Sequence, residues 1–391
     1  MANNSDVSQG VPFADLVLMP LKGTEDFVAE VDKAIIQRRK EVVIPKNEES
    51  FYKDYLKTSY IQKPGLIRFG TGEGKCELNS TIRGVDLYII ADITNSSVEY
   101  KASGHINHMS PDDHFQDLKR VIAATNGKTK RINVIMPFLY ESRQHKRTKR
   151  ESLDCALALQ ELVYMGVSNI ITFDAHDPRV MNAIPLASFD SINCYYQFIK
   201  TLLGSFDDIK IDSDNLMMIS PDEGAMHRAI YYANLLGIDV GMFYKRRDYS
   251  RIVDGRNPIV AHEFLGRHVE GKDVVIVDDM ISSGDSLIDT ARELKERKAK
   301  RVFAICTFGL FTSGLDKFDK AHEDGILEAV LTTNCIYQNK DLFGRKWYRS
   351  VDVSDYLAAI IDALNHDGSI SSYLDPADKI HEFVDQYNKG K

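Results

Sequence analysis

The stretch VVIVDDMISSGDS (residues 274–286) decides the fold of this chain. Four apolar residues run directly into two adjacent aspartates, Asp278 and Asp279, and a small hydroxyl-rich loop and the helix-like segment LIDTARELKER follow. In an open α/β sheet, ligands bind outside the carboxyl ends of the strands, so we expect the two acids at such an end. The stretch therefore predicts a buried strand, a binding loop and a helix, in that order.

The loop offers groups that bind an anion, and the acids offer groups that bind a sugar. Gly284 permits close backbone approach, the hydroxyls of Ser282, Ser283 and Ser286 can donate, and the N–H groups of a helix N-terminus favour phosphate. Adjacent carboxylates can accept hydrogen bonds from a vicinal diol or hold a hydrated magnesium ion. Together these groups describe a site for ribose 5-phosphate. The alternative is a serine-rich helix cap with solvated acids; a dinucleotide site is disfavoured because GxGxxG is missing from the sequence.

Outside this stretch, short apolar runs alternate with amphipathic segments. Runs such as LVLM (16–19) and NIITFD (169–174) are apolar almost throughout, which is typical of strands covered on both faces. Helical patterns such as SLDCALALQELVYMG (152–166) lie between them. The alternation predicts an α/β fold of mostly parallel sheets flanked by helices, in two domains joined near residues 185–195.

The composition excludes several classes of protein. Of 391 residues, 43% are hydrophobic and 27% charged, as in globular proteins, and the net charge of −8 argues against nonspecific binding of nucleic acid. The sequence has no apolar run of about 18 residues and no signal-peptide pattern at its start, so we expect no membrane span and no secretion. Its five cysteines lack CxxC and metal-ligand spacing, which indicates reduced thiols in a cytoplasmic protein.

A second group of functional candidates lies in YESRQHKRTKRE (140–151), which follows an apolar run and precedes a helical pattern. It contains five cations within eight residues: Arg143, Lys146, Arg147, Lys149 and Arg150. Such a segment is either a solvated charged loop or a mobile lid whose cations bind a polyphosphate.

The order Tyr-x-x-Arg-Gln-x-Lys in this segment resembles the catalytic flexible loop of ribose-phosphate diphosphokinases. The stretch at 274–286 resembles the phosphoribosyl-pyrophosphate loop that these enzymes share with phosphoribosyltransferases. Four more segments resemble motifs of the same family: RFGTGE (68–73), FDAH (173–176), SPDEG (220–224) and FYKRRDY (243–249). The resemblance covers roughly residues 14–374 and implies two tandem phosphoribosyltransferase-like domains, which we place at 14–190 and 191–374.

The resemblance implies transfer of the β,γ-diphosphoryl group of ATP to C1 of ribose 5-phosphate, giving 5-phosphoribosyl 1-pyrophosphate and AMP for nucleotide biosynthesis. It also implies Mg²⁺ as cofactor and a homo-oligomer built from dimers, with a hexamer as one option. A phosphoribosyltransferase acting on a nucleobase and a non-catalytic regulatory subunit are the alternatives. The cationic loop and the Lys-x-Arg pair, Lys245 and Arg247, argue against both.

The resemblance also assigns roles to residues. The catalytic candidates are Lys245, Arg247, Arg143 and Lys146. The candidates for ATP binding are Phe69, Glu73, Arg143, Gln144 and His176. Those for ribose 5-phosphate binding are Asp222, Asp278, Asp279, Ser282, Ser283, Gly284, Asp285 and Ser286. The metal candidates are Asp174, His176 and Asp222.

Three residues depart from the family's pattern. Ser282 stands where the family usually has aspartate, Asp285 where it often has glycine, and Thr71 where it usually has asparagine. A carboxylate at position 285 is unfavourable within a phosphate loop unless the side chain points to solvent.

Overall fold

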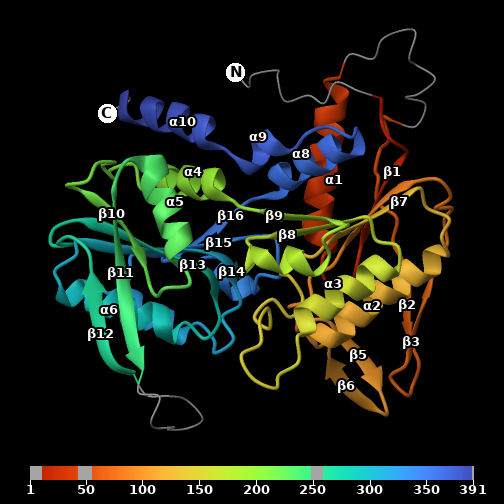
Figure 1. Cartoon of the computed structure of the whole chain (residues 1–391), viewed down its shortest axis with the longest axis horizontal. Coiled ribbons are helices and arrows are strands. Elements are labelled where there is room, and N and C mark those ends of the chain that lie inside the picture. Colours follow the sequence, from red (N-terminus) through yellow and green to blue (C-terminus); the bar gives the residue numbers. More distant parts are fainter. Residues whose placement is uncertain (1–10, 43–54, 248–258, 390–391) are drawn as a thin grey trace. The chain divides into compact units, whose positions relative to one another are not determined.

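The computed structural model describes residues 11–42, 55–247 and 259–389, with side chains except at 245–247 and 259–262. The chain forms two compact units (Figure 1). Unit 1 comprises Met1–Asn193, Asn334–Tyr337 and Asp352–Asp375, and unit 2 comprises Cys194–Thr333, Gln338–Val351 and Pro376–Lys391.

Unit 1 is built on a five-stranded parallel sheet with the strand order β1-β4-β7-β8-β9. These strands are β1 (Leu16–Pro20), β4 (Asp86–Ile90), β7 (Arg131–Ile135), β8 (Asn169–Phe173) and β9 (Ser188–Ile192). Every residue of β1 and β4 is buried, as the apolar runs predicted. The unit's helices are α1 (Glu25–Lys40), α2 (Pro111–Thr125), α3 (Asp154–Tyr164), η3 (Pro178–Ala183), α8 (Ser354–Asn365) and α9 (Ser371–Leu374).

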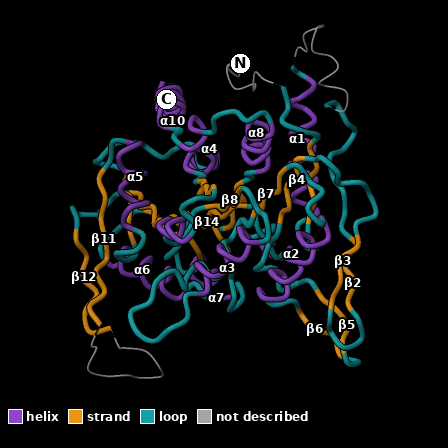
Figure 2. The backbone as a smooth tube through the Cα atoms, turned by 45° about the vertical axis from the view of Figure 1, so that its right-hand side comes forward, coloured by secondary structure: helices purple, strands orange, loops and turns teal. Residues whose placement is uncertain are grey.

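Two antiparallel hairpins of unit 1 lie outside this sheet. One pairs β2 (Gly65–Arg68) with β3 (Gly74–Glu77), and the other pairs β5 (Glu99–Ala102) with β6 (His105–His108). Figures 1 and 2 show them beside one another. The apolar runs did not predict these strands, because their residues are mostly polar and half exposed.

Helices α8 and α9 belong to unit 1, although the predicted second domain extended to residue 374. A buried polar network explains the difference. Arg39 of α1 donates to Asp362 Oδ1 at 2.7 Å and to Asn365 Oδ1 at 2.6 Å, and Asn365 donates to Asp86 Oδ2 of β4 at 2.9 Å. A buried charge needs such partners, so α8 packs where Arg39 lies.

Unit 2 contains a seven-stranded sheet with the order β12-β11-β10-β13-β14-β15-β16, in which only β12 is antiparallel to its neighbour. Its strands are β10 (Leu216–Ser220), β11 (Asp239–Arg247), β12 (Ile259–Leu265), β13 (Asp273–Ile281), β14 (Arg301–Gly309), β15 (Ala329–Thr333) and β16 (Tyr348–Val351). Its helices are α4 (Tyr195–Ser205), α5 (Met226–Leu236), α6 (Asp285–Glu296), α7 (Asp316–Glu323), η4 (Lys340–Leu342) and α10 (Ala377–Lys389).

The predicted α/β class with mostly parallel sheets is confirmed. The predicted strand–loop–helix order at 274–286 is also found, as β13, a short loop and α6. None of the helices in the described part of the chain has the length and apolar character that a membrane crossing needs.

Candidate active-site elements

The loop between β13 and α6 has the geometry of an anion site. Gly284 precedes α6 with φ at +89°, a conformation that favours glycine. A Cβ added there would lie 2.7 Å from Cε2 of Phe318 and closer still to its Cζ. The Phe318 ring therefore leaves no room for a side chain at this position. The first N–H groups of α6 lack partners within the helix and favour an anion beside this loop.

The carboxylate of Asp285 is exposed and paired. It forms an ion pair with Lys317 of α7 and accepts a hydrogen bond from Ser283 Oγ at 2.8 Å. Because the Asp285 side chain points to solvent, its carboxylate is tolerated in this loop. Lys317 lies 32 residues further along the chain, and the sequence contains no signal that pairs the two.

Asp278 and Asp279 lie within β13 rather than at its end, which corrects the prediction. Pairing with β14 continues to Ile281, whereas pairing with β10 stops at Ile276. The acids therefore lie beyond the end of β10 but not beyond that of β14. Asp279 is 4% exposed, and its N–H donates to Asp278 Oδ1 at 2.9 Å.

Burial raises the pKa of Asp278 well above its usual value, and the charges of Asp279 and Asp222 raise it further. Asp222 follows β10 and is held by the entry to α5, where its Oδ1 accepts hydrogen bonds from the N–H groups of Gly224 at 2.9 Å and Ala225 at 3.2 Å. The structure thus brings three predicted acids together in unit 2. Such a concentration of negative charge suits hydroxyl donors or a cation.

The predicted catalytic pair, Lys245 and Arg247, forms the last part of β11. The side chains of both residues lie outside the described part of the structure. Their assignment therefore stays a prediction.

In unit 1, Phe69 and Glu73 occupy the turn between β2 and β3. The N–H of Phe69 donates to the carbonyl of Glu73 at 2.8 Å, which closes the turn. Phe69 is 47% exposed, so its ring is available to stack on a flat ligand. The hydroxyl of Thr71 donates to Glu73 Oε2 at 2.9 Å and orients that carboxylate.

The cationic loop lies between β7 and α3. Its five Lys and Arg side chains are exposed, and none of them forms an ion pair with any residue that the structure describes. The base of the loop is held, because the ring of Tyr140 stacks on Phe115 with centroids 4.2 Å apart and its hydroxyl donates to Asp112 Oδ1 at 2.6 Å. The loop therefore presents a cluster of exposed cations on a fixed base.

Gln144 has a contact that its assignment to ATP did not anticipate. Its side-chain amide donates to the carbonyl of Ser152 at 2.8 Å and so joins the two ends of the loop. In this conformation Gln144 is a structural residue of the loop.

Asp174 and His176 follow β8 directly. Asp174 is buried and has a φ of +36°, a region that aspartate adopts more readily than most residues other than glycine. His176 is exposed, and its ring centroid lies 5.3 Å from that of His145 in the cationic loop. Sequence reasoning did not identify this second histidine.

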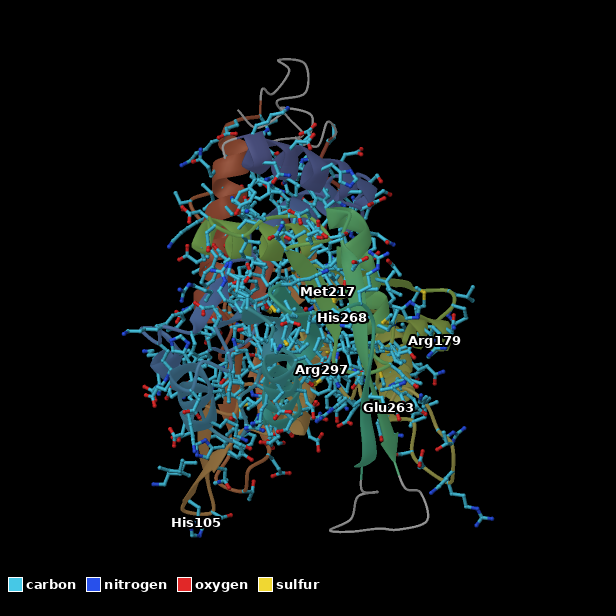
Figure 3. The ribbon with its side chains drawn as sticks, turned by 90° about the vertical axis from the view of Figure 1, so that its left-hand side faces the viewer. His105, Arg179, Met217, Glu263, His268 and Arg297 are labelled. Atoms are coloured by element: carbon cyan, nitrogen blue, oxygen red, sulfur yellow. The ribbon has the colours of Figure 1, made fainter. Side chains whose placement is uncertain are left out.

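Asp177 fixes the surroundings of these histidines. Arg179, an exposed residue labelled in Figure 3, binds Asp177 and lowers the pKa of its carboxyl to about 2. The Asp177 Oδ2 lies 3.5 Å from Nε2 of His145, while burial lowers the pKa of that histidine. The cationic loop is thus connected to the segment after β8.

The segment after β8 offers donors of the kind that bind a divalent metal ion. Over the described residues, no group of three or more His, Cys, Asp or Glu side chains is arranged to hold a metal. Mg²⁺ usually keeps several waters and binds through one or two carboxylates together with substrate phosphates. Asp174 offers one carboxylate at the carboxyl end of a parallel strand, where such a site is expected.

Comparisons with known proteins give one consistent result. The family model of the N-terminal domain of ribose phosphate pyrophosphokinase matches residues 48–166, and that of the phosphoribosyl synthetase-associated domain matches residues 263–375. A ribose-phosphate pyrophosphokinase of Vibrio cholerae is 28% identical over 315 residues, which cover 78% of this chain and 89% of the relative. One from Aquifex aeolicus is 25% identical over 311 residues, with the same coverage.

The fold is also that of a solved protein. The crystal structure of phosphoribosylpyrophosphate synthetase from Mycobacterium smegmatis superposes with a TM-score of 0.69 and covers 90% of this chain and 100% of its own, at 19% identity. At this identity the likeness concerns the fold alone. It agrees with the predicted architecture of two tandem phosphoribosyltransferase-like domains.

Proposed function

The chain belongs to the ribose-phosphate pyrophosphokinase family, and we propose that it transfers the β,γ-diphosphoryl group of ATP to the C1 hydroxyl of ribose 5-phosphate. The products are 5-phosphoribosyl 1-pyrophosphate, a precursor for nucleotide biosynthesis, and AMP. The observation that carries the proposal is the cationic loop, because five exposed cations without described ion-pair partners suit a polyphosphate donor. A nucleobase transferase has no need of such a loop.

In unit 1, we assign Phe69 and Glu73 to the adenine ring, and Arg143 and His176 to the phosphates of ATP. In unit 2, the α6 N-terminus with Ser282–Ser286 binds the 5-phosphate, and the acids at 222, 278 and 279 orient the sugar. Phosphoryl transfer depends on positioning and on stabilisation of the charge that develops. We propose that the loop cations in unit 1, and Lys245 and Arg247 in unit 2, stabilise the negative charge that develops, and that the loop excludes water that would hydrolyse ATP.

Magnesium is the metal that we propose. When bound, it would neutralise charge on the β- and γ-phosphates of ATP. Asp174 and His176 would hold it in unit 1, and Asp222 is the metal candidate of unit 2. All the other roles above belong to side chains and backbone groups of this chain.

We further propose a cytoplasmic homo-oligomer built from dimers. All five cysteines are free thiols and four of them are buried, which suits a reducing compartment. Sedimentation equilibrium of the whole chain tests the assembly: a mass of two or more subunits supports it, and a monomer at micromolar concentration contradicts it.

The decisive experiment measures AMP formation from ATP and Mg²⁺, with and without ribose 5-phosphate. The variants are Lys245→Ala and a matched control, Lys298→Ala, whose exposed lysine pairs with Glu270. We expect AMP only when the sugar is present, a loss of at least about 100-fold in Lys245→Ala, and wild-type activity in the control. Wild-type protein that makes no sugar-dependent AMP would refute the proposal and favour a transferase or a regulatory subunit.

A further inference from the structure

The β5–β6 hairpin contacts the turn that carries Phe69 and Glu73. The N–H of Ser103, at the hairpin's tip, donates to the carbonyl of Gly70 at 2.7 Å. Ser103 and Gly104 both have positive φ, at 51° and 81°, as in the tight turns that favour hairpins. His105, labelled in Figure 3, begins the returning strand at this tip. One hairpin is therefore hydrogen-bonded to the turn of the other.

A buried arginine links the same two hairpins. The guanidinium of Arg68, the residue before the turn, lies over the ring of Tyr100 in β5 at 5.1 Å from its centroid. It also donates to both carboxylate oxygens of Asp117 in α2, at 2.5 and 3.0 Å. The Arg68 side chain is only 8% exposed, so both contacts are shielded from water. A bidentate pair of this kind fixes the direction of the guanidinium.

The first turn of α2 connects these hairpins to the cationic loop. Asp113 completes a capping box with Ser110, and its Oδ1 lies 3.5 Å from the hydroxyl of Tyr100. Asp112, one residue earlier, accepts the hydrogen bond from Tyr140 at the base of the loop. Both elements that we assign to ATP in unit 1 are thus attached to one helix start.

We propose that the β5–β6 hairpin, through Tyr100 and Ser103, positions the turn that presents Phe69 and Glu73 to the nucleotide. A two-stranded hairpin is marginally stable by itself. Arg68 anchors the β2–β3 hairpin to α2, and the hydrogen bond from Ser103 to Gly70 adds support at the turn that carries the exposed ring. Neither Tyr100 nor Ser103 is a catalytic residue; both act through the turn. The inference rests on the proposed function, because it takes the turn to be the adenine site.

The test removes the support and measures each substrate separately. In one variant two glycines replace Glu99–His108; the flanking residues are already joined, because the N–H of Met109 donates to the carbonyl of Val98 at 2.8 Å. The second is Tyr100→Ala, with Tyr100→Phe as the conservative partner that keeps the ring over the guanidinium. The control is Ser103→Gly, which keeps the N–H and suits the positive φ.

We expect the excision to raise KM for ATP about tenfold, with kcat and KM for ribose 5-phosphate within about twofold. Loss of a cation–π contact predicts a rise of about two- to fivefold in Tyr100→Ala, and values near wild type in Tyr100→Phe and Ser103→Gly. The ratio of kcat/KM for ATP to that for GTP should fall with the excision, a readout that a purely structural role does not change.

An unchanged KM for ATP in both the excision and Tyr100→Ala would overturn the inference, and so would an equal rise in KM for both substrates. If the excised chain does not fold, the comparison of Tyr100→Ala with Tyr100→Phe decides alone. Failure of the proposed function is distinguished by the wild type, which would then make no sugar-dependent AMP at all.

Discussion

Replacing Gly284 with alanine should destabilise unit 2 for two reasons, the backbone conformation at this residue and the space available to a Cβ. The positive φ of +89° costs a residue with a Cβ about 1–2 kcal/mol. The new methyl group would also overlap the ring of Phe318, at 2.7 Å from Cε2, and overpacking of a core costs about 1–3 kcal/mol. We therefore expect a loss of about 2–5 kcal/mol in the free energy of unfolding.

The single tryptophan of the chain provides the assay. Trp347 is buried and stacks on Phe318, with ring centroids 5.2 Å apart, so its fluorescence during urea unfolding reports on this part of unit 2. The matched control is Gly325→Ala, where φ is +67° but an added Cβ would meet nothing within 4 Å. That control should lose only about 1–2 kcal/mol.

A double-mutant cycle isolates the overlap. Phe318→Leu shortens the side chain below the loop, so Gly284→Ala should cost about 1–3 kcal/mol less in that background than in the wild type. The reasoning is refuted if Gly284→Ala costs no more than Gly325→Ala, or if the Phe318→Leu background leaves its cost unchanged.

Three further predictions follow from buried charges and from the proposed metal. Asp278→Asn should raise Tm more at pH 8 than at pH 5. The pKa of Asp278 is raised in the folded state, so the wild-type protein favours the protonated form of this carboxyl and loses stability as pH rises through that pKa. An equal gain in Tm at both pH values would contradict this. Asp362→Ala should lower the free energy of unfolding in urea by about 3–5 kcal/mol, because it leaves the buried charge of Arg39 without its carboxylate. The double variant Asp362→Ala, Arg39→Met should recover most of this loss. No recovery would show that the lost packing, and not the charge, causes the loss. Chelation with EDTA should abolish AMP formation, and excess Mg²⁺ should restore it. The variant Asp174→Asn should need about tenfold more Mg²⁺ for half-maximal activity. An unchanged Mg²⁺ requirement would show that Asp174 does not bind the metal.

Local signals in the sequence were enough to predict the class of the fold and the main loops of the site. Apolar runs of strand length identified the buried strands, and the acids, the hydroxyl-rich loop and the amphipathic segment after one of them identified the strand–loop–helix order at 274–286. The cations at 143–150 identified the loop between β7 and α3. Each of these signals depends on residues within about ten positions of one another, as a strand, a turn or a helix start does.

Strands of mixed polar and apolar composition were not predicted, because they lack a continuous apolar run. The edge strands β9 (SFDSI) and β16 (YRSV) are polar on part of their surface, so they lack the continuous apolar run of a central strand. The β5–β6 hairpin is half exposed, and its contacts with Arg68 and Gly70 are visible only in the folded structure.

The sequence by itself thus determined the kind of fold, the loop that follows β13 and the cationic loop. Only the tertiary structure decided the partners: Lys317 for Asp285, His145 beside His176, and Asp362 for Arg39, 323 residues away. The physical reason is that backbone propensity and periodicity act over neighbouring residues, whereas ion pairs and buried networks depend on which elements pack together. A charge that folding buries needs a partner, and only the packed fold shows which charges are buried and which residues pair with them.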